Sequence, residues 1–169
     1  MRKIIGQGHW CSGSLAAAVL FVGCTALAQA GGDLTGTWTL VSSITDKDGK
    51  KTDQFGTGAK GMLHLDSSRR FMLTIIGPDL PRFASGNRAG GTPEENGSVV
   101  RRSIAMLGTY SVDASSLTFH VESATFPNWN GTTQTRLLVD TPANELRYVT
   151  PTASSGGVGT VTWRRVAPD

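Results

Sequence analysis

The chain has little of the chemistry that cross-links and metal sites require. Cys11 and Cys24 are its two cysteines, both among the first thirty residues, and it has three histidines. If that first segment is removed, no disulfide can form, and His64 and His120 alone cannot supply a structural zinc cluster. The sequence therefore predicts a fold that depends on its core and hydrogen bonds, with no metal and no other cofactor.

The sequence also lacks an apolar run long enough to span a membrane comfortably. Its main apolar run, residues 15–22, follows Arg2 and Lys3 and precedes Ala28-Gln29-Ala30. A basic start, a short apolar run and small residues before a cleavage site are typical of a signal peptide. We predict that residues 1–30 are removed, that the protein is periplasmic or secreted, and that no membrane span remains. Lipidation at Cys24, in Val22-Gly23-Cys24, is the alternative.

A strong charge is missing from the remaining chain. Loss of Arg2 and Lys3 leaves 14 Lys and Arg against 13 Asp and Glu, so the formal net charge falls from +3 to +1. No cluster of basic residues with interleaved aromatic residues survives. We therefore expect no binding to nucleic acid.

Short segments rich in β-branched and aromatic residues, separated by turn residues, make up most of residues 31–169. We predict strands at residues 36–44, 61–65, 71–76, 109–112, 116–124, 133–139, 145–149 and 160–166. Turn residues such as Asp46-Lys47-Asp48-Gly49 stand between them. The pattern favours an all-β fold, an antiparallel up-and-down barrel of about eight strands, because closure removes exposed sheet edges.

One helix is expected among the strands. Thr92-Pro93-Glu94-Glu95 is a capping box with proline at the first helical position. Val99, Ile104 and Leu107 then recur near helical spacing until Gly108, which predicts a helix over 93–107. Residues 71–76 are apolar on both faces, so we expect this helix to cover the outer face of that strand.

An ordered set of motifs extends across the predicted barrel. Gly36-Thr37-Trp38 opens it, Pro127-Asn128-Trp129-Asn130-Gly131 lies within it, and Trp163-Arg164-Arg165 closes it. The set resembles the lipocalin-like domain family of bacteria and fungi over nearly all of residues 34–166. That resemblance implies a barrel around a cavity for a small, mostly apolar molecule. It also implies that Arg164 or Arg165 covers Trp38 as a structural contact, a role that we assign to Arg164.

His120 and Glu122 are the candidates for catalysis. They lie two residues apart in a predicted strand and so share one face. An imidazole near a carboxylate can move a proton at neutral pH. However, Leu117, Phe119 and Val121 form the apolar face, which patterning places inward. Two hypotheses stay open: an exposed pair, or an acid/base pair inside the barrel.

Arg136 and Gln134 are the candidates for polar recognition. The period of two places them on one face of a strand, where they could grip a carboxylate or a carbonyl. An inward arginine needs an anionic partner, either Glu122 on the neighbouring strand or a ligand. Trp129 and Tyr110 are the aromatic residues that we expect to line the opening.

These features lead to one functional prediction and two alternatives. We predict an exported barrel whose partner is a small apolar molecule, with the carbonyl or carboxylate end of that molecule near Arg136. The first alternative is a small isomerase or cyclase that uses His120 and Glu122. The second is a structural or partner-binding module whose interior is filled by side chains.

Overall fold

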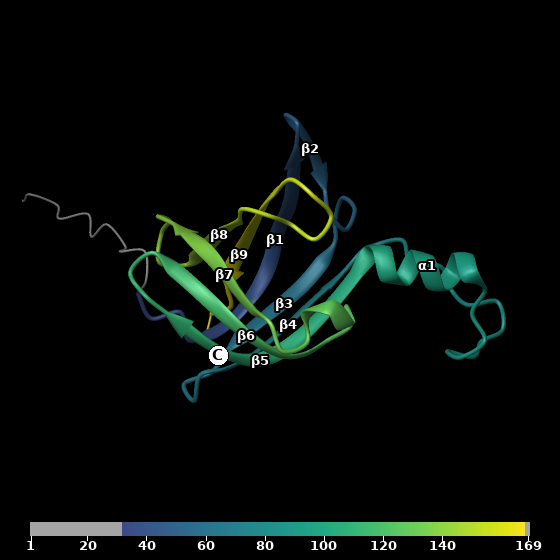
Figure 1. The fold of residues 1–169 in the computed structure, drawn as a ribbon, viewed down its shortest axis with the longest axis horizontal. Helices are drawn as coiled ribbons and strands as arrows, with labels where there is room; N and C mark the ends of the chain where they lie inside the picture. Colours follow the sequence, from purple (N-terminus) through teal and green to yellow (C-terminus); the bar gives the residue numbers. More distant parts are fainter. Residues whose placement is uncertain (1–31, 168–169) are drawn as a thin grey trace, which may run out of the picture.

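Nine strands, one α-helix and one short 3-10 helix are formed by residues 32–167, the part of the chain that the structure, a computed structural model, describes (Figure 1). In chain order these elements are β1 (Gly36–Lys47), β2 (Lys50–Asp53), β3 (Lys60–Leu65), β4 (Arg70–Ile76), α1 (Pro93–Arg102), β5 (Ser103–Val112), β6 (Ser116–Ala124), η1 (Pro127–Trp129), β7 (Thr133–Val139), β8 (Glu145–Thr150) and β9 (Val158–Arg165). The predicted signal peptide and the alternative lipidation site at Cys24 lie outside the described residues.

Eight of the strands close into an antiparallel barrel. The sheet order is β1-β3-β4-β5-β6-β7-β8-β9, and β9 returns to pair with β1. The remaining strand, β2, pairs with the far end of β1 through a turn at Asp48 and Gly49. Both turn residues have a positive φ, 54° and 80°, which suits a two-residue hairpin. The structure confirms the predicted all-β barrel and adds β2 to it.

Inward-facing side chains fill one end of this barrel. Alternate residues are buried along much of β3, β4 and β6, as at Leu63 and Leu65, at Phe71, Leu73 and Ile75, and at Leu117, Phe119 and Val121. The largest fully buried side chains are Trp38, Trp163, Phe119, Leu63, Leu65 and Leu117. The rings of Phe71 and Phe119 lie 4.5 Å apart between centroids. These packed side chains form the floor of the barrel.

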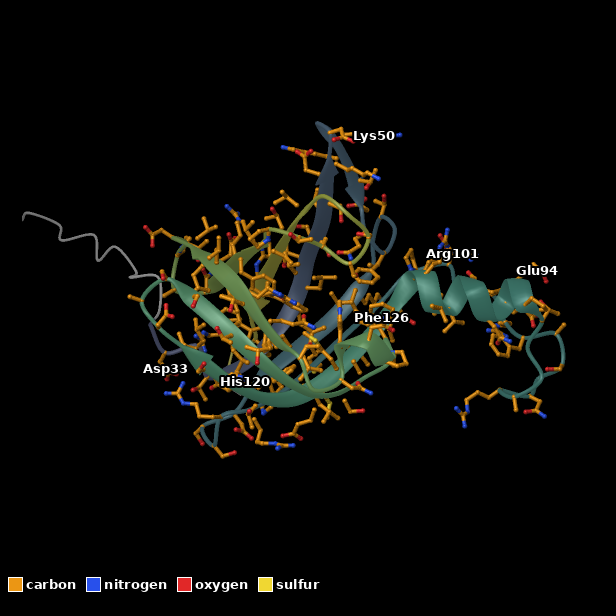
Figure 2. All side chains as sticks on the ribbon, viewed as in Figure 1. Asp33, Lys50, Glu94, Arg101, His120 and Phe126 are labelled. Carbon is orange, nitrogen blue, oxygen red and sulfur yellow. The ribbon has the colours of Figure 1, made fainter. Side chains whose placement is uncertain are left out.

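Helix α1 is shorter than predicted and does not cover β4. Its capping box is present, since the Glu95 amide donates to Thr92 Oγ1 at 3.2 Å and the Thr92 amide donates to Glu95 Oε2 at 2.8 Å. The helix ends at Arg102, buries none of its residues and extends away from the barrel (Figures 1 and 2). On the outer face of β4, Met72 is 59% exposed and Ile76 is 46% exposed. The expected cover is therefore wrong.

Pairing with β4 explains why the helix stops early. Residues 103–109 lie in β5, where Ile104 pairs with Ile75 and Leu107 with Met72. A Cβ on Gly108 would lie 2.0 Å from the carbonyl oxygen of His120, beside an irregularity in the β5–β6 register. Glycine at 108 thus permits close approach of β6 and does not end a helix. Pairing of seven residues with β4 favours a strand over a helix here. The apolar spacing that suggested a helix also fits the alternation of a strand.

The contact over Trp38 is made by Arg165 and not by Arg164. The Arg165 guanidinium lies 4.1 Å from the centroid of the Trp38 ring and donates to the carbonyls of Thr35 and Asp33. The indole N–H of Trp38 donates to the Leu34 carbonyl at 3.0 Å. Arg164 is exposed, because neighbouring residues of a strand point to opposite faces. The structural contact exists, and its assignment to Arg164 is wrong by one residue.

Candidate functional site

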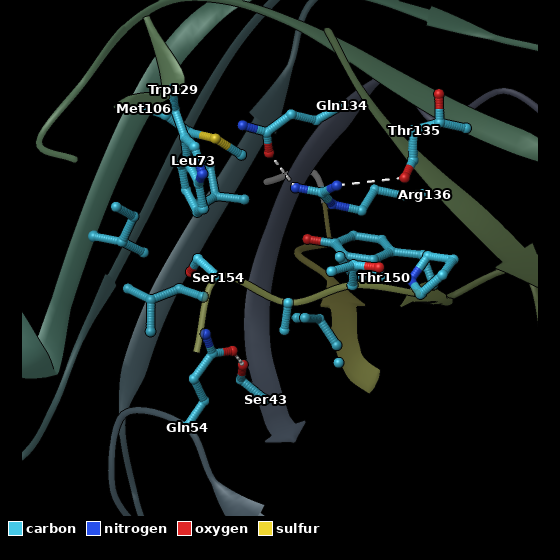
Figure 3. A pocket seen from close by; sticks show the side chains of 18 of the residues that line it. Ser43, Gln54, Leu73, Met106, Trp129, Gln134, Thr135, Arg136, Thr150 and Ser154 are labelled. Carbon is cyan, nitrogen blue, oxygen red and sulfur yellow. Dashed lines mark hydrogen bonds between the residues drawn. The ribbon is translucent and has the colours of Figure 1, made fainter. Parts of the chain in front are cut away.

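A cavity of about 530 Å³ lies toward the end of the barrel opposite the Trp38 floor (Figure 3). Its volume falls within the range of pockets that bind small organic molecules. The apolar part of its wall comes from β4, β5, η1 and β9 and includes Leu73, Ile75, Ile104, Met106, Trp129 and Val161. The polar part includes Ser43, Gln54, Gln134, Arg136 and Tyr148. The site is thus a mostly apolar pocket with a few fixed polar groups.

Small side chains explain why the barrel is open at this end. Where the floor has two tryptophans, the cavity wall has Ser43 on β1, Gly159 on β9 and Ala153 in the loop between β8 and β9. The Ser43 hydroxyl donates to Gln54 Oε1 at 3.2 Å, so this side of the wall satisfies its own polar groups. Short side chains at inward positions leave volume that larger ones would fill.

Arg136 is the unusual residue of the pocket. It is only 8% exposed, and its Nη2 donates to Gln134 Oε1 at 2.5 Å while its Nη1 donates to the Thr135 carbonyl at 3.3 Å (Figure 3). Its Cζ lies 5.8 Å from the centroid of the Phe119 ring. Burial lowers the pKa of Arg136 from its ordinary value. Among residues 32–167 no carboxylate forms an ion pair with it.

The internal partner that the sequence suggested for Arg136 is engaged elsewhere. Glu122 accepts two hydrogen bonds from Arg70, at 2.7 and 3.0 Å, on the outer surface of the barrel. Arg136 pairs with Leu117 in the β6–β7 register and faces inward with it. Glu122 lies an odd number of residues from Leu117, so it faces outward. The expectation of an internal Arg136–Glu122 salt bridge is therefore wrong.

Gln134 and Tyr148 complete the polar end of the pocket. Gln134 Nε2 donates to Thr132 Oγ1 at 3.2 Å, which orients the amide so that its oxygen accepts from Arg136. Tyr148 is buried, lines the cavity and lies close enough to Arg136 to interact with its charge. Burial raises the pKa of Tyr148, so its hydroxyl remains a hydrogen-bond donor at neutral pH. Tyr148 was not among the predicted site residues, although alternation with the buried Leu146 gives its inward direction.

The two aromatic residues expected at the opening have different positions. Trp129 lines the cavity, and its ring makes an edge-to-face contact with Phe126 at 5.6 Å. Tyr110 is buried but is not among the lining residues. Its hydroxyl donates to the Asp66 carbonyl at 2.8 Å in the β3–β4 turn, and Arg69 lies over its ring. Trp129 therefore lies in the cavity wall, whereas Tyr110 packs in the core.

His120, labelled in Figure 2, and Glu122 are both exposed on the outer face of β6. His120 Nδ1 is 3.2 Å from Thr133 Oγ1, and Glu122 is paired with Arg70. Leu117, Phe119 and Val121 point inward, as the apolar alternation indicated. The hypothesis of an acid/base pair inside the cavity has no geometric basis, because neither residue lines that cavity.

Strands β7 and β8 pair over only part of their length beside the polar end of the cavity. These strands pair only from Leu137 to Val139, against Arg147 to Val149. The first four residues of β7, which include Gln134 and Arg136, have no β8 partner. Thr135, Pro151 and Thr152 belong to the cavity lining at this position. Arg136 therefore lies on a part of β7 that pairs with β6 and not with β8.

A second cavity, of about 630 Å³, lies at the opposite end of the barrel. Its wall includes Trp38, Arg165 and residues 138–139 and 141–146. The charged groups there have partners: Arg165 donates to backbone carbonyls, Asp33 accepts from the Thr35 amide, and Glu145 forms an ion pair with Arg147 at 2.7 Å. We therefore take as the candidate site the first cavity, where a buried arginine has no carboxylate partner among residues 32–167.

Comparison with known proteins identifies the family. Within residues 32–167, no helix is long and apolar enough to cross a membrane. A search of curated proteins finds no match to the chain. Residues 35–166, which span the barrel from β1 to just beyond β9, match the family model described as a lipocalin-like domain. The chain belongs to the lipocalin-like domain family.

Proposed function

We propose that this protein holds a small, mostly apolar molecule in the cavity between Leu73, Met106 and Trp129. The observation that carries the proposal is the wall of that cavity, where apolar side chains from several strands surround a volume of about 530 Å³. Burial of apolar ligand surface there would be favourable by roughly 25 cal/mol per Å². Membership of a lipocalin-like family agrees with a role as a ligand-binding barrel.

Titration with a neutral apolar dye, N-phenyl-naphthylamine, tests this proposal. Fluorescence of the dye should rise and saturate as it enters the cavity of the wild-type protein. Ser154 is exposed and lines the cavity, whereas the neighbouring Ser155 is exposed and does not. Ser154→Trp should reduce the affinity at least about tenfold by filling the opening, a loss of about 1.4 kcal/mol. Ser155→Trp is the matched control and should bind as the wild type does.

Two results would count against the proposal. Dye binding that never saturates, together with no response to Ser154→Trp, would favour a structural or partner-binding module with no ligand. Equal loss of binding in Ser154→Trp and Ser155→Trp would place the dye outside the cavity.

Export is part of the same proposal. It is supported by the basic start, the apolar run at 15–22 and Ala28-Gln29-Ala30 in the sequence. Intact-mass measurement of the native protein should give a chain that begins at Gly31. A lipid-modified chain that begins at Cys24 would instead support the lipoprotein alternative, and a full-length chain in the cytosol would contradict both.

A further inference from the structure

We propose that the ligand of this cavity is a monoanion with one carboxylate, bound by Arg136 on the part of β7 that is not paired with β8, with its apolar body against Leu73 and Met106. This inference rests on the proposed function, because it names the chemical class of molecule that the cavity takes. Four observations lead to it, concerning charge, free donors, the composition of the wall and the geometry of the strands.

Among residues 32–167, no carboxylate is seen in an ion pair with Arg136. The guanidinium is buried, and Glu122 and Glu145 form ion pairs with Arg70 and Arg147 instead. A buried charge without a partner is costly, and proteins usually pair such groups. A neutral ligand would leave this cost in place and could displace water that solvates the guanidinium. An anionic ligand would remove the cost of burying the unpaired charge.

The guanidinium also has hydrogen-bond donors to spare. An arginine has five N–H donors in a planar fork, and Arg136 uses two of them, on the Gln134 side-chain oxygen and the Thr135 carbonyl. The planar fork matches the two oxygens of a carboxylate. Gln134 occupies one side of the fork and so fixes its direction, which makes it a positioning residue (Figure 3). The Tyr148 hydroxyl lines the same end of the cavity and can donate to the same anion.

The composition of the cavity wall limits the charge of the ligand. Of the described residues that line it, Arg136 is the one Lys, Arg or His, and none is Asp or Glu. One cation balances one negative charge. A phosphate monoester, with a charge between about −1.5 and −2 at neutral pH, would keep part of its charge uncompensated in a mostly apolar pocket. The wall therefore favours a carboxylate over a phosphate.

The strand geometry gives the orientation of the ligand. Arg136 lies on the part of β7 that β8 does not cover, so the carboxylate would sit near the side of the barrel. Leu73 and Met106 are paired neighbours on β4 and β5 and form an apolar wall deeper in the cavity. In this orientation the carboxylate of the ligand contacts Arg136, and its apolar body contacts Leu73 and Met106.

Decanoate and decanol are the matched probes that test the inference, since they differ in the head group alone. Each is titrated at neutral pH by displacement of N-phenyl-naphthylamine. A hydrogen bond to a charged group corresponds to an affinity ratio of roughly ten to one hundred. Wild-type protein should therefore bind decanoate at least about tenfold more tightly than decanol.

Two variants assign the preference to Arg136. Arg136→Met removes the charge and keeps an apolar side chain of similar length, so it should bind both probes about equally. Gln134→Glu is isosteric and supplies an internal carboxylate where the guanidinium already donates at 2.5 Å. It should fold readily, keep its affinity for decanol and lose the preference for decanoate. Arg164→Met removes an exposed arginine and should behave as wild type.

Each contrary result has a distinct meaning. Equal displacement by decanoate and decanol in the wild type would overturn the inference and leave the proposed function, binding of a small apolar molecule, standing. Failure of the dye and both probes to bind would overturn the proposed function, and the inference with it. A preference for decanoate that persists in both Arg136→Met and Gln134→Glu would show that the anion binds elsewhere, which also overturns the assignment.

Discussion

Replacing Arg165 by methionine should destabilise the barrel, whereas the same replacement at Arg164 should leave it nearly unchanged. Arg165 lies over the Trp38 ring at 4.1 Å and donates to the carbonyls of Thr35 and Asp33. These contacts fasten the segment before β1 to the end of β9. Arg164 is exposed and directly precedes it on the same strand, so the two variants form a matched pair.

The magnitude follows from the contacts that methionine cannot make. A cation–π contact contributes about 0.5–2 kcal/mol. Each hydrogen bond contributes about 0.5–1.5 kcal/mol net. Methionine keeps part of the packing of the side-chain stem over the indole. We therefore expect the free energy of unfolding to fall by about 2–4 kcal/mol for Arg165→Met, against less than about 0.5 kcal/mol for Arg164→Met.

Urea unfolding followed by tryptophan fluorescence and far-ultraviolet circular dichroism measures both values. The slope against urea should be similar in the two variants, so that a shift in midpoint reports stability. If Arg164→Met lost as much stability as Arg165→Met, or if Arg165→Met were neutral, the structural role given to the Trp38–Arg165 contact would be refuted.

Three further predictions concern the loss of stability at low pH, the helix α1 and the outer face of β6. Asp113 accepts hydrogen bonds from the backbone N–H groups of Ser115 and Ser116, which helps lower its pKa to about 2. Because the pKa is about 3.9 when unfolded, its stabilisation is present above about pH 4 and is lost as pH falls toward 2. The difference in Tm between wild type and Asp113→Asn should therefore shrink over that interval, and a constant difference would contradict this account. Replacing residues 80–100 by a short Gly-Ser turn should leave the stability of the barrel within about 0.5 kcal/mol, because α1 buries none of its residues; loss of cooperative unfolding would contradict this. His120→Gln should leave both thermal stability and dye binding unchanged in calorimetry and titration, since the imidazole is exposed and outside the cavity; weaker dye binding would contradict the placement.

The barrel could be predicted because its signals are local. In β6 the alternation of Leu117, Phe119 and Val121 with polar residues fixes both the strand and its inward face. The capping box at Thr92 and Glu95 depends on residues three apart, so it is readable without the rest of the fold. The inward direction of Arg136 and Gln134 follows from the same period of two.

The wrong predictions all depend on long-range pairing. Ile104 fits a helical spacing, and its pairing with Ile75 on β4 decides that it lies in a strand. Whether Arg164 or Arg165 covers Trp38 is a matter of one residue of register, and β1 contains an irregularity just after Leu40. Tyr110 and Tyr148 both face inward, but only the stagger of the closed barrel places one in the core and the other at the cavity.

Native mass spectrometry of the protein purified from its own source tests the central claim most directly. The account predicts a folded chain that carries a small organic molecule, seen as added mass that disappears when the protein is unfolded. Ser154→Trp, expressed in the same source, should carry less of it than Ser155→Trp. A folded chain with no added mass, together with no saturable binding across a panel of apolar probes, would contradict the claim that this barrel holds a small apolar molecule.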